Sequence, residues 1–208
     1  MKKLIALILA LGIIFGLVGC GNNNNKVNEQ TKKVNEQTKK TAPEDTINSF
    51  FAEFKKCNFD NAKKYLLVDK NIDFSAYKDF TKGEKDAIKY WVEKTGYEIK
   101  SMEITNDSAE ATINISTLNG QKIYSDYMKD LLNLKEKYIS AKDQKDKEEY
   151  MQAYDKALID SIRSKNNEIV TNTVNLELEN KNGKWYIVGN QNFTNALYGG
   201  FDPEKFKS

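Results

Sequence analysis

The sequence predicts an α+β fold: N-terminal helices packed on a curved antiparallel sheet, with a long helical insertion before the last hairpin. Three observations indicate it. Apolar residues recur at threes and fours over 43–93 and then alternate with polar residues over 97–115. Helical spacing returns over about 122–165. A last alternating segment turns at Asn182-Gly183, a dipeptide typical of tight hairpins.

The chain begins with a pattern typical of a secretory signal peptide. Two lysines at positions 2 and 3 precede an apolar, uncharged run over 4–18, and Gly19 stands immediately before Cys20. The run is shorter than the roughly 20 apolar residues of a membrane-spanning helix. An ordinary cleaved signal beside a chance cysteine and an uncleaved anchor are the alternatives.

Residues 1–19 together with Cys20 resemble the signal of bacterial lipoproteins. In such proteins the signal is cut before the cysteine, and the thiol receives a diacylglycerol whose acyl chains, such as palmitate, enter the bilayer. The resemblance implies that Cys20 is the lipidation site and that the protein sits on the outer face of the cytoplasmic membrane. Two acyl chains hold a protein stably on a membrane and one does not, because each buried methylene contributes about 0.8 kcal/mol of binding free energy.

Residues 20–42 are expected to form a disordered spacer after the lipidated cysteine. Four asparagines are followed by two tandem copies of Lys-Val-Asn-Glu-Gln-Thr-Lys, at 26–32 and 33–39. No apolar face exists, and the composition is that of disorder. Val27 and Val34 lie seven residues apart, but two heptads with one apolar position each are too few for a coiled coil. Such a spacer spans roughly 30 Å.

The folded domain is expected over 43–201, with a frayed tail over 202–208. Its first helix starts at Pro43, because proline and the two following carboxylates suit a first turn. Its apolar stripe contains Ile47, Phe50, Phe51, Phe54 and Cys57. Nothing basic is placed to lower the pKa of Cys57, so a buried structural thiol is expected.

Two more helices are expected before the sheet. The second is short and carries Ala62, Tyr65 and Leu66. The third opens with the capping box Thr81-Lys82-Gly83-Glu84, presents Ala87, Ile88, Trp91 and Val92 on one side, and ends at Gly96. Between them, the segment 69–73 is similar to a calcium loop. Phenylalanine occupies its glycine and bidentate glutamate positions, so a loop without metal is expected.

The first two strands are expected at Tyr97–Thr105 and Ala109–Ile115. Alternation slips near Ser101-Met102, as a β-bulge would cause. Asn106-Asp107 turns the chain, and Asn119-Gly120 ends the second strand.

The insertion at about 122–165 has two helical phases, separated by a wholly polar stretch over 142–149. Two helices and one long helix with a solvated middle both fit. The insertion is rich in tyrosine, which suits exposed interfaces. The candidate partner surface contains Tyr124, Tyr127, Tyr138, Tyr150 and Tyr154. The alternative is that these rings cover the sheet.

The last hairpin joins a strand with Val170, Val174, Leu176 and Leu178 on one side to a strand over 185–188. A short helical turn follows, with Phe193, Ala196, Leu197 and Tyr198, and Gly199-Gly200 stops it.

Composition excludes several kinds of site. The 208 residues contain no histidine, which rules out a Ser-His-Asp triad, a Cys-His pair and zinc held by imidazole. Without the two lysines of the signal, basic and acidic side chains balance, so no nucleic-acid partner is expected. If Cys20 is lipidated, Cys57 is the only free thiol and no intramolecular disulfide can form. No metal, cofactor or catalytic residue is assigned.

The order of elements is similar to that of the small NTF2-like lipoproteins of low-GC Gram-positive bacteria. The likeness spans 43–200 and depends on two stretches: PEDTINSFF at 43–51 with AKKYL at 62–66, and GKWYI at 183–187 with YGG at 198–200. It implies a bent sheet wrapped around helices, leaving a cone-shaped cavity. The residues that would line the cone are Tyr65, Trp91, Trp185 and Tyr198, with plain core packing as the alternative.

The sequence favours a non-enzymatic, lipid-anchored domain that binds an envelope protein or a small apolar ligand. Glu110, Glu177 and Glu179 lie on the polar phase of their strands, so no carboxylate stands out as a general base. One alternative is an isomerase- or hydratase-like enzyme that uses the cone. Another, by fold analogy alone, is an accessory factor in cell-envelope assembly.

Overall fold

The computed structural model describes residues 42–67, 75–138 and 144–202. It is α+β, with one open antiparallel sheet of four strands. The strands, neighbours in chain order, are β1 (Gly96–Thr105), β2 (Ser108–Leu118), β3 (Ile169–Lys181) and β4 (Lys184–Val188). The helices are α2 (Pro43–Lys55), α3 (Phe59–Ala62), α4 (Lys82–Glu93), α5 (Gly120–Tyr138), α6 (Gln144–Arg163) and α7 (Gln191–Leu197), with 3-10 helices η1 (Lys63–Tyr65) and η2 (Ser75–Asp79).

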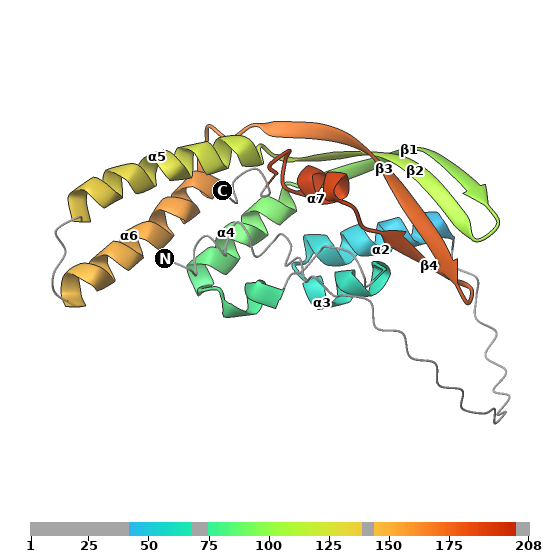
Figure 1. The fold of residues 1–208 in the computed structure, drawn as a ribbon, viewed down its shortest axis with the longest axis horizontal. Helices are drawn as coiled ribbons and strands as arrows, with labels where there is room; N and C mark the ends of the chain where they lie inside the picture. The colour runs from blue at the N-terminus through green and yellow to red at the C-terminus, as the bar shows by residue number, and fades with distance from the viewer. Residues whose placement is uncertain (1–41, 68–74, 139–143, 203–208) are drawn as a thin grey trace, which may run out of the picture.

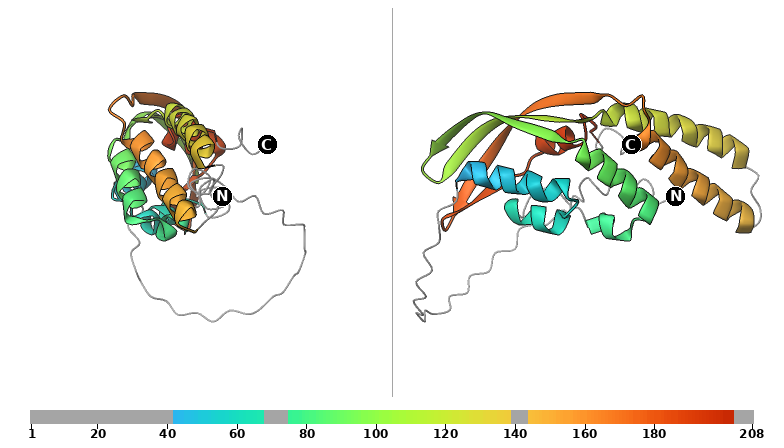
Figure 2. Two further views of the ribbon diagram at one scale, coloured as in Figure 1. Left: turned by 90° about the vertical axis from the view of Figure 1, so that its left-hand side faces the viewer. Right: turned by 180° about the vertical axis from the view of Figure 1, so that it is seen from behind.

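The sheet bends over α2, α3, α4 and α7, which all lie on its concave side (Figure 1). Seen end-on, its convex side carries no helix of the described part of the chain (Figure 2). The main core fills the space between the sheet and these helices. Its largest fully buried side chains include Phe50, Phe51, Phe193, Ile113, Leu176 and Ile187.

Helix α2 ends two residues earlier than its apolar stripe predicts. The expected stripe reaches Cys57, but the helix stops at Lys55 and Cys57 adopts a φ of 58°. The N–H groups of Cys57 and Asn58 donate to the carbonyls of Phe54 and Glu53. This is a Schellman ending with cysteine in the left-handed position that glycine usually takes. The expected buried thiol is therefore half-buried, in a turn after the helix.

The capping box before α4 is confirmed. The Thr81 hydroxyl accepts from the Glu84 N–H at 3.3 Å, and the Glu84 carboxylate accepts from the Thr81 N–H at 2.6 Å. The expected ending at Gly96 is wrong. Helix α4 stops at Glu93, and Gly96 begins β1 without a positive φ.

The strand register confirms the expected irregularities. The pairing of β1 with β2 shifts between Ile99 and Ser101, so the bulge lies at Lys100, close to the expected position. Asn106 has a φ of 53°, and Asn182 and Gly183 have φ of 56° and 84°. Both centres of the final turn are thus left-handed, as a type I′ turn requires.

The insertion consists of two helices, which settles one of the alternatives left open by the sequence. Helices α5 and α6 lie side by side, and α6 also packs on α4. A second buried cluster joins the three helices and contains Ala87, Leu118, Ile123, Tyr127, Ala157, Leu158 and Ile162. The α5–α6 hairpin projects past α4, at the end of the molecule opposite the start of α2 (Figures 1 and 2).

The start of α5 and the segment that follows α7 approach each other closely at two glycines, Gly120 and Gly199. The Gly120 N–H donates to the Gly199 carbonyl at 3.2 Å. A Cβ on Gly120 would lie 1.9 Å from the Tyr198 carbonyl oxygen, and one on Gly199 would lie 1.8 Å from that of Leu118. Only glycine permits this approach, and it fixes the insertion to the end of α7.

Several expectations fall outside the described residues. These are the signal over 1–19, Cys20 with its spacer, the segment 69–73 and the tail after Asp202. In the ranges that the structure covers, no helix has the length and hydropathy needed to cross a bilayer.

Candidate functional site

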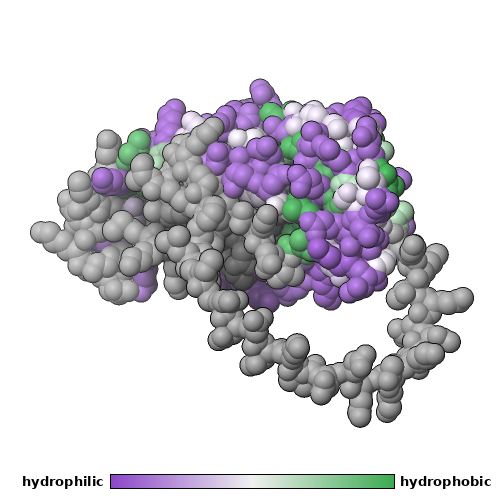
Figure 3. Space-filling view, turned by 45° about the vertical axis from the view of Figure 1, so that its right-hand side comes forward, coloured by the Kyte–Doolittle hydropathy of each residue, from purple (hydrophilic) through white to green (hydrophobic). Residues whose placement is uncertain are grey.

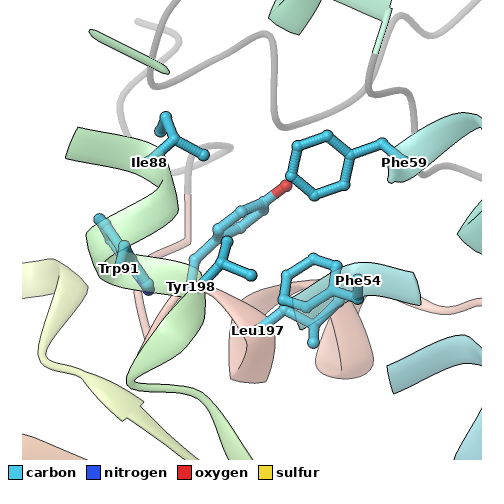
Figure 4. Close-up of a pocket in the computed structure, with 7 residues that line it drawn as sticks. Phe54, Phe59, Ile88, Trp91, Leu197 and Tyr198 are labelled. Atoms are coloured by element: carbon cyan, nitrogen blue, oxygen red, sulfur yellow. The ribbon is translucent and has the colours of Figure 1, made fainter. Parts of the chain in front are cut away.

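A small apolar cavity lies between α2, α3, α4 and α7 (Figure 4). Its lining residues are Phe54, Phe59, Ile88, Trp91, Val92, Leu197 and Tyr198. The space open to the centre of a water-sized sphere is about 10 Å³. That is room for about one water molecule, yet the walls offer few hydrogen-bond partners. Of the four expected lining residues, Trp91 and Tyr198 contribute to this cavity and Tyr65 and Trp185 do not.

Trp91 is held in the cavity wall by a buried chain of hydrogen bonds. Its indole N–H donates to the Thr117 hydroxyl at 3.0 Å. The Thr117 hydroxyl lies 2.9 Å from that of Thr95, and both threonines are buried. The chain connects α4 to β2, so one wall of the cavity is fixed to the sheet.

Tyr198 closes α7 and extends across the cavity toward Phe59 (Figure 4). Burial raises the pKa of its phenol well above the usual range, so the hydroxyl stays protonated at physiological pH. Trp185 is buried in the main core and Tyr65 packs half-buried against it. For these two residues the core-packing interpretation describes the structure better than a cavity lining.

Tyr127, Tyr150 and Tyr154 of the insertion gather along the seam between α5 and α6. The ring centroids of Tyr127 and Tyr154 lie 5.8 Å apart, and those of Tyr150 and Tyr154 lie 5.7 Å apart. Tyr124 packs on Phe201 at 4.9 Å. Tyr127 is only 3% exposed, whereas Tyr124, Tyr150 and Tyr154 are half-buried. Tyr138 is the last residue of α5, and its side chain is not among those that the structure describes.

The seam is apolar around Tyr127. Burial is the main cause that raises the pKa of Tyr127 far above its ordinary value, and the neighbouring Tyr154 adds to it. The Tyr127 hydroxyl has no hydrogen-bond partner of standard geometry among the described residues. Tyr127, Tyr150 and Tyr154 thus join α5 to α6, whereas Tyr124 packs against the chain after α7.

Among the described side chains of the hairpin, the large exposed apolar ones are two methionines and a leucine. Met128 is 36% exposed, Leu132 is 59% exposed and Met151 is 41% exposed. The face of the molecule in Figure 3 is, by contrast, mostly hydrophilic, with hydrophobic residues scattered singly. Sequence reasoning missed Met128 and Leu132. They stand four apart, which was the available signal, but outside the phase shared by Tyr124 and Leu131.

The sheet carboxylates lie on the convex side, away from the cavity. Glu110 pairs with Glu103 on one neighbouring strand and with Glu177 on the other, and all three are exposed. Glu179 is held by Lys181 at 2.5 Å. Within the described ranges, no group of three His, Cys, Asp or Glu side chains could hold a metal ion.

Comparison with protein-family models, with curated proteins and with solved structures finds no match to this chain.

Proposed function

We propose that this protein is a lipoprotein, anchored through Cys20 to the outer face of the cytoplasmic membrane, whose folded domain binds a partner without catalysing a reaction. The signal-like segment 1–19 followed by Cys20 supports the anchor. The exposed apolar face of the projecting α5–α6 hairpin supports the binding role. That face is the single structural observation that carries the proposal.

We place the domain among NTF2-like folds. A bent antiparallel sheet that closes over α2, α3, α4 and α7 supports this assignment. The hairpin is then an addition between β2 and β3. Additions of this kind are a usual place for function to differ among proteins of one fold.

The position of the hairpin favours a scaffold role over ligand storage in the cone. The spacer joins the domain at Pro43, whereas the hairpin extends from the other end of the molecule. With the lipid on Cys20, the hairpin can therefore face envelope components away from the anchor. A small apolar ligand in the cavity would need the walls to move, because the present space is about 10 Å³.

An isomerase- or hydratase-like enzyme would need a substrate-sized cavity with a carboxylate directed into it. The cavity described above has apolar walls, and the strand carboxylates Glu110 and Glu177 lie on the opposite side of the sheet. These observations support the binding role.

The anchor is tested on the full chain expressed in a bacterium that processes lipoproteins. We expect the mature protein to begin at Cys20, to carry acyl chains in mass spectrometry, and to leave the membrane only in detergent. Cys20→Ser is the matched variant and should remain soluble or unprocessed. A wild-type protein that is released without detergent, or that begins at another residue, would overturn the proposed anchor.

A further inference from the structure

One wall of the apolar cavity is supported by the α5–α6 hairpin. Trp91 lines the cavity, and the same side chain packs against the buried cluster that α4 shares with α5 and α6. Its indole N–H donates to the Thr117 hydroxyl at 3.0 Å, three residues before α5 begins at Gly120. The position of this wall therefore depends on where the hairpin and its root lie.

The second aromatic wall, Tyr198, is joined to the same root. The next residue, Gly199, accepts at its carbonyl from the Gly120 N–H at 3.2 Å. One turn further along α5, the Tyr124 ring packs on Phe201 at 4.9 Å. The other lining residues belong instead to the main core, namely Phe54, Phe59, Ile88, Val92 and Leu197. The cavity thus has one side fixed in the main core and two aromatic walls connected to the hairpin.

Movement of Trp91 would turn this cavity into a site for an uncharged apolar molecule. The present space of about 10 Å³ has room for about one water molecule, so a larger ligand needs a wall to move. An indole that swings outward frees the volume of an aromatic ring. All seven lining side chains are aliphatic or aromatic, and a charged ligand buried among them without a partner would be unfavourable.

We propose that the α5–α6 hairpin controls the cavity: when the hairpin moves away from α4, Trp91 follows and the cavity opens to an uncharged apolar ligand about the size of one aromatic ring. The main core, with the other side of the cavity, stays folded in this open state. A ligand can make such a minor conformation dominant.

This inference goes beyond the proposed partner binding and does not depend on it. It adds a form of regulation if both hold. A partner that keeps the hairpin against α4 would weaken binding of the apolar ligand, and by linkage the ligand would weaken binding of the partner by the same factor.

Glycine variants can displace the hairpin without deleting any side-chain volume. A Cβ on Gly120 would lie 1.9 Å from the Tyr198 carbonyl oxygen, and one on Gly83 would lie 2.9 Å from the Ile159 side chain of α6. Gly120→Ala should therefore push the root of the hairpin away from the end of α7, and Gly83→Ala should push α6 away from α4. Gly96→Ala is the matched control, because a Cβ there meets no atom within 4 Å.

The probe is benzene, added to the unlipidated mature chain, residues 20–208 with Cys20→Ser, and followed by NMR of the isoleucine and leucine methyl groups. We expect Gly120→Ala to bind benzene about tenfold more tightly than the wild type, as a tenfold larger open population would give. Gly83→Ala should raise the affinity less, and Gly96→Ala should leave it unchanged. The methyl signals of Ile88 and Leu197 should respond to benzene.

Hydrogen exchange of the Trp91 indole N–H gives a second measurement that needs no ligand. We expect this N–H to exchange at the rate of the α5 and α6 amides, and faster in Gly83→Ala than in the wild type, while β2 amides change little. Circular dichroism checks that every variant folds. If Gly120→Ala does not fold, Gly83→Ala decides, because the flexible end of Ile159 can yield there.

Three results would overturn the proposal. The first is a benzene affinity that no folded hairpin-displacing variant raises. The second is an equal rise in Gly96→Ala, which would show that the hairpin is not its cause. The third is a Trp91 indole N–H that stays as protected as the β2 amides in Gly83→Ala, since Trp91 would then not follow the hairpin.

Discussion

At the scale of single residues, the main source of local strain is the cysteine that ends α2. Cys57 occupies a left-handed conformation, which costs an ordinary residue about 1 kcal/mol and glycine almost nothing. Its half-buried thiol packs against the core, and burial raises the pKa of the neighbouring Tyr77 to about 12. The residue thus combines a strained backbone with useful side-chain contacts.

We expect Cys57→Gly to be more stable than Cys57→Ala by about 0.5–1 kcal/mol. Both variants delete the sulfur, but only glycine relieves the positive φ. This order is opposite to that of helix interiors, where alanine is better. Urea denaturation measures the difference. If alanine proved equal or better, the Schellman ending would not be the feature that sets stability at this position.

Gly199 and Gly200 provide a matched pair that separates backbone strain from steric clash. Both have positive φ, of 61° and 80°. A Cβ on Gly200 has its nearest neighbour at 3.5 Å, whereas one on Gly199 would lie 1.8 Å from the Leu118 carbonyl oxygen. Gly200→Ala should cost about 1 kcal/mol and Gly199→Ala more than about 3 kcal/mol. Equal melting temperatures for the two variants would contradict the close approach of Gly199 to the end of β2.

Glu53 gives the α2 ending a dependence on pH. The hydrogen bond from Lys56 lowers the pKa of Glu53, and amides of Asn61 and Asn58 act in the same direction. In the unfolded chain this carboxyl has its ordinary pKa of 4.5, and folding lowers that pKa. The ionised carboxylate therefore stabilises the folded state above pH 4.5, and this contribution is lost as pH falls through the folded pKa.

We therefore expect Glu53→Gln to be less stable than the wild type at pH 7 and to converge with it as pH falls below 4.5 and through the folded pKa of Glu53. Urea midpoints at successive pH values make the comparison, with Asp130→Asn on the exposed side of α5 as the control. A constant difference between Glu53→Gln and the wild type across this range would show that the charge of Glu53 is not involved.

At the scale of elements, the sheet places like charges directly opposite each other. Glu110 on β2 has Glu103 and Glu177 as its cross-strand partners. Opposed like charges in a sheet are destabilising by a few tenths to about 1 kcal/mol. The rest of this convex side shows favourable pairs instead, such as Thr112 donating to Asn175 at 3.0 Å.

Glu110→Gln should therefore stabilise the protein, by up to about 1 kcal/mol. The gain should shrink as sodium chloride is raised, because salt screens exposed charges. Glu179→Gln is the control, since Glu179 is held by Lys181 and should lose slight stability instead. Thermal melts at low and high salt distinguish these outcomes. A gain that does not depend on salt would mean that the charges are not its cause.

Elements set by local chemistry were the ones that the sequence could predict. The capping box at Thr81 and the turn at Asn182 need only neighbouring residues, and both are confirmed. The end of α2 was missed because Cys57 carries none of the glycine signal for a left-handed position.

Contacts between distant segments could not be predicted. The approach of Gly120 to Gly199 and the outward position of Leu132 depend on how α5 packs, and apolar spacing does not specify this. The same holds for part of the cavity lining, because Trp91 and Tyr198 line the cavity as expected, whereas Tyr65 and Trp185 do not.

At the scale of the whole molecule, two buried clusters share α4. Ile88 and Val92 of this helix belong to the main core, whereas its Ala87 belongs to the cluster with α5 and α6. Gly83 lets α4 and α6 approach closely, because a Cβ on Gly83 would lie 2.9 Å from the Ile159 side chain. The hairpin is attached mainly through α4, Leu118 of β2 and the glycine crossing. We therefore expect that it opens while the main core stays folded.

This arrangement predicts that replacing two buried leucines speeds hydrogen exchange of backbone amides in different parts of the chain. Leu158 lies in the hairpin cluster and Leu176 in the main core, and both are buried. Each change to alanine should cost about 2–5 kcal/mol.

Leu158→Ala should speed exchange of α5 and α6 amides while β2 and β3 amides change little, because only the hairpin opens more often. Leu176→Ala should speed exchange everywhere, because the hairpin loses its support when the sheet unfolds. Equal loss of protection across the chain in both variants would show a single cooperative unit, and the hairpin would then be as rigid a docking element as the sheet itself.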